Sequence, residues 1–194
     1  TPSLFTLSKS FSGPESETAT GPNFPRTYTV TATIAAGQTI NNLQLTDTLP
    51  NNVQFVSMVS PAAASCPTLP STTTPGGTLR CNFAAASGTV NMTFNFYVPR
   101  VDSTLAAVLN ASTGDDGTSC NNASITAGTW AALDTRDVGG LNFTTTPYSP
   151  AGCENTFTPK SIAIQKAVTV IGGGNIVPGK VLEYTLTVQV SDFF

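Results

Sequence analysis

The sequence predicts an all-β protein, an immunoglobulin-like β-sandwich followed by the first two strands of a second immunoglobulin-like unit. Apolar and polar residues alternate with a period of two along most of the chain, whereas a helical stripe is almost absent. Turn signals such as AAGQ, TPGG and IGGGN separate these runs at the spacing of a sandwich. Two early segments also recur near the end, which indicates an internal repeat.

The clearest strand covers residues 26–34, RTYTVTATI. Its apolar residues share one face and its threonines the other, as in a strand with one buried side. The same alternation occurs in NNLQLTDTL, residues 41–49, and in TVNMTFNFYV, residues 89–98. The core-facing residues of the three strands are predicted to be Tyr28, Val30, Ala32, Ile34, Leu43, Leu45, Leu49, Val90, Met92, Phe94, Phe96 and Val98. Further strands are expected near residues 4–11, 53–59, 78–83, 120–126, 161–171 and 180–190.

The four cysteines, at positions 66, 81, 120 and 153, predict two disulfides and an oxidising compartment. None has the C-x-x-C spacing of a zinc site, and the chain has no histidine. Neighbours in sequence suggest the pairs Cys66–Cys81 and Cys120–Cys153, one of three possible connectivities. The first pair would close a long loop rich in Pro and Thr that begins near residue 60.

The composition argues against several function classes. Only 10% of the residues are charged and the net charge is -3, so no basic face is available for nucleic acid. No window approaches the roughly 20 apolar residues of a membrane span, and any export signal would lie outside these residues. Without histidine or a G-x-S-x-G motif, we expect no enzyme and no cofactor.

The internal repeat has a period near 157 residues. LSKSF at 7–11 matches IQKAV at 164–168, and YTVTATI at 28–34 matches YTLTVQV at 184–190, so that Lys9 and Lys166 are equivalent. We therefore expect one immunoglobulin-like unit over residues 1–158 and an incomplete second repeat over 159–194. Two strands alone cannot bury a sandwich face, so more chain follows, or they pack on the first unit, or they pair with a neighbouring molecule.

A lysine in the first strand, YTVT, LQLTDTLPNNVQF and NNASITAG together resemble the immunoglobulin-like bacterial surface repeats named domain of unknown function 11. The resemblance covers most of residues 5–59, 89–130 and 161–194. It implies a large, repetitive, secreted or surface-anchored protein with structural or adhesive roles and no catalysis.

The chain is also similar to pilin and adhesin domains that form an internal Lys–Asn isopeptide bond. That resemblance implies a lysine that attacks, an acid that shuttles the proton and an asparagine that is attacked, and the candidates are Lys9, Asp47 and Asn121. The period of two turns all three toward the apolar side of their strands. An apolar core favours the neutral amine and the protonated acid that the reaction needs.

The alternative to an isopeptide bond is that the same three residues have only structural roles. Lys9 could extend its ammonium to solvent at a strand end, Asp47 could cap a turn, and Asn121 could bond to the backbone.

The sequence also offers a hypothesis of a calcium site. Asp115 and Asp116 in TGDDGTS, with Asp134 and Asp137 in LDTRD, could gather around Ca²⁺, which prefers carboxylate and carbonyl oxygens on loops. Turn formation explains the same aspartates equally well.

These observations predict a structural subunit of an extracellular fibre or bacterial cell-surface appendage. Its main partner would be itself, because the unpaired strands of the second repeat could extend the sheet of another unit. The alternative is an adhesin module whose loops bind a host protein or a glycan.

Overall fold

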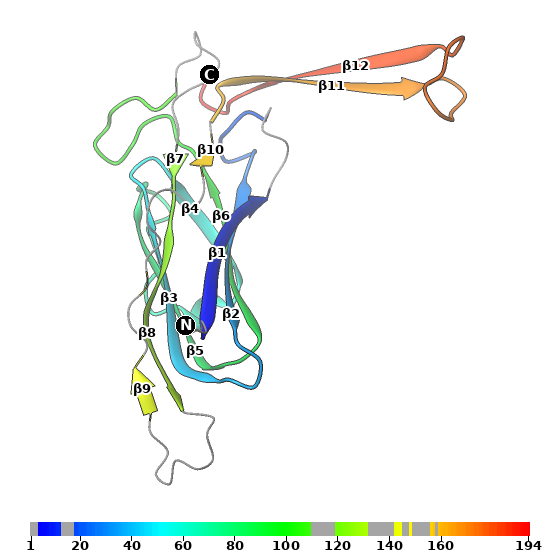
Figure 1. Cartoon of the computed structure of the whole chain (residues 1–194). Coiled ribbons are helices and arrows are strands. Elements are labelled where there is room, and N and C mark those ends of the chain that lie inside the picture. Colours follow the sequence, from blue (N-terminus) through cyan, green and yellow to red (C-terminus); the bar gives the residue numbers. More distant parts are fainter. Residues whose placement is uncertain are drawn as a thin grey trace.

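The computed structural model describes residues 4–12, 18–109, 119–131, 142–144, 148, 156–157 and 159–194. These residues form two four-stranded and two two-stranded antiparallel sheets (Figure 1). The predicted fold class is confirmed. The strands are β1 Phe5–Ser12, β2 Arg26–Ile34, β3 Ile40–Leu49, β4 Gln54–Ser60, β5 Gly77–Ala86, β6 Thr89–Tyr97, β7 Ser119–Cys120, β8 Ala123–Ala131, β9 Asn142–Thr144, β10 Thr156–Phe157, β11 Ile162–Val170 and β12 Leu182–Val190.

One layer of the sandwich has the strand order β1-β2-β6-β4. Strand β2 lies between β1 and β6, and Tyr28 faces Phe94 across the second pairing. The inward residues of β2 and β6 are buried, as the alternation predicts, with the exception of Val90, which is half-buried against the core. The Tyr28 ring stacks on Phe96 at 4.0 Å between centroids, which adds a specific aromatic contact to the burial of area.

The other layer has the order β5-β3-β8-β9. Leu43 and Leu45 of β3, Leu79 of β5 and Ile125 of β8 join the inward residues of the first layer in one hydrophobic core. The strand predicted over residues 120–126 is two elements, β7 and the longer β8. The register between β3 and β8 shifts near Asn42, whose φ of 51° is a left-handed conformation that asparagine tolerates.

The disulfide Cys66–Cys81 is present and confirms that predicted pair. It ties the loop after β4, which contains a short 3-10 helix at Ala63–Ser65, to Cys81, a buried residue of the edge strand β5. The predicted pair Cys120–Cys153 cannot be placed, because Cys153 lies outside the described residues.

Strands β11 and β12 form a separate two-stranded ribbon that projects from one end of the sandwich (Figure 1). Its base is attached to residues 18–24 of the first unit. Asp192 accepts hydrogen bonds from the backbone and side chain of Asn23, at 2.6 and 2.9 Å, and Ala19 forms a parallel bridge with Lys160.

Candidate functional site

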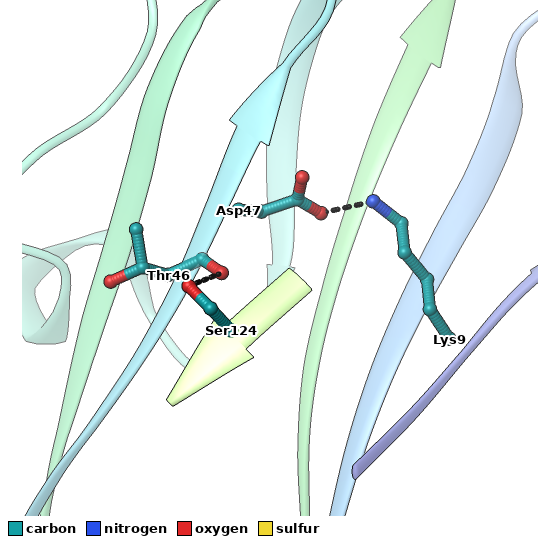
Figure 2. A network of polar contacts seen from close by, with 4 residues as sticks. All are labelled: Lys9, Thr46, Asp47 and Ser124. Atoms are coloured by element: carbon teal, nitrogen blue, oxygen red, sulfur yellow. Dashed lines mark hydrogen bonds and ion pairs between the residues drawn. The ribbon is translucent and has the colours of Figure 1, made fainter. Parts of the chain in front are cut away.

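The candidate site lies between the two layers of the sandwich. Lys9 reaches inward from β1 of one sheet, and Asp47 reaches toward it from β3 of the other (Figure 2). The ammonium of Lys9 donates a hydrogen bond to Oδ2 of Asp47, and neither side chain is exposed to solvent. Water is therefore excluded from an ion pair that spans the core.

Aromatic rings surround the lysine. Nζ of Lys9 lies 4.2 Å from the centroid of the Tyr28 ring and 5.7 Å from that of Phe94. At these separations the faces of the rings attract a cation, which offsets part of the cost of removing the ammonium from water. The Lys9 side chain is not exposed, so the alternative in which it extends its ammonium to solvent is wrong.

Asn121 precedes β8 and is 1% exposed. Neither polar atom of its side-chain amide has a hydrogen bond of ordinary geometry within the described part of the chain. The amide still interacts with the Tyr28 hydroxyl, and this interaction lowers the pKa of that hydroxyl. Asn121 and Lys9 therefore approach the same tyrosine, one at its hydroxyl and the other at its ring face.

The Tyr28 hydroxyl reports the electrostatics of this region. Burial raises its pKa well above the ordinary value, and the nearby Asp47 carboxylate raises it further. The Arg26 guanidinium and the Asn121 amide lower it by less. Asp47 and Asn121 are thus both electrostatic neighbours of Tyr28, and the amine, carboxyl and carboxamide predicted from the sequence all gather around one aromatic ring.

Strand alternation also predicts an inward side chain at Arg26, at the start of β2. Arg26 has the same parity as Tyr28 and Val30, and its side chain is 2% exposed. Its Nη2 donates a 2.9 Å hydrogen bond to the carbonyl of Thr18. Arg26 therefore holds the segment before β2 against the sandwich, close to the attachment of the ribbon.

The four aspartates of the calcium hypothesis, Asp115, Asp116, Asp134 and Asp137, lie outside the described residues. Among the residues that the structure describes, no three His, Cys, Asp or Glu side chains gather as a metal site would require. The same part of the chain contains no helix that is long and apolar enough to cross a membrane.

No model of a known protein family and no curated protein matches the chain. Among solved structures, it is similar to two domains of the major pilin SpaD from Corynebacterium diphtheriae, with 13% identity, a TM-score of 0.40, and coverage of 85% of this chain and 54% of that one. It is also similar to BcpA, the major pilin subunit of Bacillus cereus, with 11% identity, a TM-score of 0.45, and coverage of 96% and 56%. The chain thus spans little more than half of each pilin structure. The resemblance to domain of unknown function 11 stays a prediction.

Proposed function

We propose that this chain is a structural module of an extracellular, pilus-like fibre whose immunoglobulin-like units are joined through β-strand pairing. The observation that carries the proposal is the β11–β12 ribbon, which projects from the sandwich (Figure 1). The ribbon exposes large apolar side chains such as Ile164, Leu186 and Val188. Exposed apolar patches of this kind mark interaction sites. A unit that makes such a contact at one end can be repeated along a fibre.

The internal bonds of the sandwich suit an extracellular structural role. The Cys66–Cys81 disulfide favours an oxidising compartment. We further propose that Lys9 and Asn121 form an intramolecular isopeptide bond. Asp47 takes a proton from the Lys9 ammonium, and the neutral Nζ attacks Cγ of Asn121, so that a C–N bond forms. The bond from Cγ to Nδ2 breaks and ammonia leaves, while Asp47 relays a proton from Nζ to Nδ2. The burial of all three side chains supports this chemistry, because water cannot compete as the nucleophile.

The mass of the intact protein tests the cross-link. The oxidised chain should be lighter than its sequence requires by one ammonia, beyond the hydrogens lost to disulfides. Lys9→Ala and Asn121→Ala should restore the missing mass, and Lys166→Ala is the matched control that should keep the deficit. A wild-type mass without the deficit would show that Lys9 and Asn121 are not cross-linked.

Immunogold electron microscopy of native material tests the fibre role independently of the cross-link. Antibodies against the folded chain should label filamentous structures repeatedly along their length. Label that is confined to the cell interior or to unassembled material would contradict the proposed function.

A further inference from the structure

The β11–β12 ribbon repeats the β1–β2 hairpin residue by residue. In the first unit Lys9 pairs with Val30 and Phe11 with Tyr28. In the ribbon Lys166 pairs with Leu186 and Val168 with Tyr184. Each residue pairs with the equivalent of its counterpart's partner, so the two hairpins have the same register.

The lysine and the tyrosine also meet in the same way in both hairpins. Nζ of Lys166 lies 4.4 Å from the centroid of the Tyr184 ring, compared with 4.2 Å between Lys9 and Tyr28. The ribbon therefore has the geometry of a hairpin whose lysine belongs inside a core.

Burial separates the two hairpins. Val30 and Ala32 are 0% exposed, whereas their equivalents Leu186 and Val188 are 64% and 62% exposed. In the first unit this face is covered by the opposite sheet, in which Asp47 forms an ion pair with Lys9. Strand β6 pairs with the edge of β2 that β1 does not occupy. No described element plays either role for the ribbon.

The ribbon contacts the first unit through its other face. Gln165 donates to the hydroxyl of Thr18 at 3.0 Å, and Gln189 accepts from the backbone of Ala19 at 3.2 Å. Both glutamines alternate with the apolar residues, so the face that carries Lys166 and Leu186 is directed away from these contacts. Folding of the apolar face onto the first unit would break this attachment.

We propose that the apolar face of the ribbon is the docking surface for the remaining strands of a second immunoglobulin-like unit, which bring a carboxylate to Lys166 and a strand to the free edge of β12. This inference rests on the proposed function, which assigns the joined units to a fibre. Charge complementarity specifies the partner. Docking would bury the Lys166 ammonium, and a buried ammonium needs an acid as its counter-ion.

A second copy of this chain does not meet these requirements. Its own hairpin β1–β2 already occupies the corresponding place in its sandwich, and its Asp47 already pairs with Lys9. Two ribbons placed face to face would bring their Lys166 ammonium groups together, where like charges repel.

The test supplies the missing strands. A chain in which residues 35–158 are appended after Phe194 provides a second copy of β3–β10 to the ribbon. Amide hydrogen exchange in β12 should slow to the range measured for β2 in the same molecule. Leu186→Glu should abolish this protection, whereas Thr187→Glu, on the opposite face, is the matched control and should retain it. Lys166→Glu should also abolish it, because it would face an acid.

Three results would overturn the proposal. The first is β12 exchange in the extended chain that equals exchange in the 194-residue chain. The second is β12 protection that grows with the concentration of the 194-residue chain, since a second copy would then be the partner.

The third comes from a variant that needs no extension. When the inward residues of β1 and β2 are replaced by those of β11 and β12, loss of cooperative unfolding would refute the equivalence of the hairpins. Docking without fibres in micrographs would refute only the proposed function.

Discussion

The ammonium nitrogen of Lys9 lies 4.2 Å from the centre of the Tyr28 ring, inside a sandwich core that excludes water. A lysine in such a position needs both a counter-ion and a polarisable surface, and Asp47 and the tyrosine provide them. The arrangement links the two sheets through a buried ion pair, and it can therefore be tested through the coupling of its members.

Removal of Asp47 should destabilise the fold strongly. In the Asn121→Ala background, where no isopeptide bond can form, Asp47→Leu leaves the Lys9 ammonium buried without its carboxylate, and we expect a loss of about 3–5 kcal/mol in the free energy of unfolding. The double variant Lys9→Met with Asp47→Leu removes both charges and should lose less than the single variant. Urea denaturation of the two single variants, the double variant and their Asn121→Ala parent measures the coupling. Additive losses would show that the two charges do not depend on each other.

The disulfide should contribute through the loop that it closes. Cys66 and Cys81 are 15 residues apart, and a loop of this length corresponds to about 3 kcal/mol in the chain-entropy model. Replacement of both cysteines by alanine should lower the free energy of unfolding by about that amount. Thermal denaturation measures the change. Since Cys66→Ala alone also breaks the bond, it should lose a similar amount, and a stable single variant with an unstable double variant would contradict the entropic explanation.

Gly21 controls the attachment of the ribbon. Its φ of 146° is a conformation that side chains rarely adopt, and an added Cβ would lie 2.8 Å from Cγ of Asp192. Gly21→Ala should therefore displace Asp192 and break its hydrogen bonds to Asn23, so that exchange of the Asn23 amide becomes faster. Gly88→Ala is the matched control, because Gly88 has a φ of 60° with nothing within 4 Å. It should strain its own turn and leave Asn23 unchanged. Equal exchange at Asn23 in the wild type and Gly21→Ala would show that the attachment does not need this close approach.

Alternation of residues predicted most of the side chains of β2 and β3 that enter the core, because each strand has one solvent face and one buried face. The predicted apolar core did not include the buried Arg26 of β2, or Ile40 of β3, which lies beyond the register shift near Asn42. Alternation did not predict the irregular register of β4 against β6. Shifts between Phe55 and Ser57, and between Met58 and Ser60, interrupt the alternation, and Val56 and Val59 are exposed as a result. A bulge depends on the pairing partner and leaves no periodic signal in its own strand.

The candidate site was predictable in part for the same reason. Parity directed Lys9, Asp47 and Asn121 inward, and the structure buries all three. The part played by Tyr28 could not be read from parity, because it depends on a diagonal contact between adjacent strands. The contact between Asn23 and Asp192 joins segments that are far apart in the chain, and neither segment has a repeating pattern that would reveal it.

The raised pKa of Tyr28 predicts a specific loss of stability in alkali. Burial is the main cause of the rise, followed by the Asp47 carboxylate. The unfolded chain releases the phenolic proton near the ordinary pKa of about 10, while the folded chain retains it, so the folded state binds more protons above that pH. The stabilisation is therefore complete below about pH 10 and is lost progressively as the pH rises above it.

Comparison with Tyr28→Phe isolates this effect, since phenylalanine keeps the ring but has no proton to lose. The free energy of unfolding of the wild type should fall more steeply above about pH 10 than that of the variant. Tyr184→Phe replaces a tyrosine that is 56% exposed, and its curve should follow the wild type. Chemical denaturation at several alkaline pH values provides the curves. Parallel curves for wild type and Tyr28→Phe would mean that the Tyr28 hydroxyl titrates alike in the folded and unfolded chains, and that the core around Lys9 is open to water.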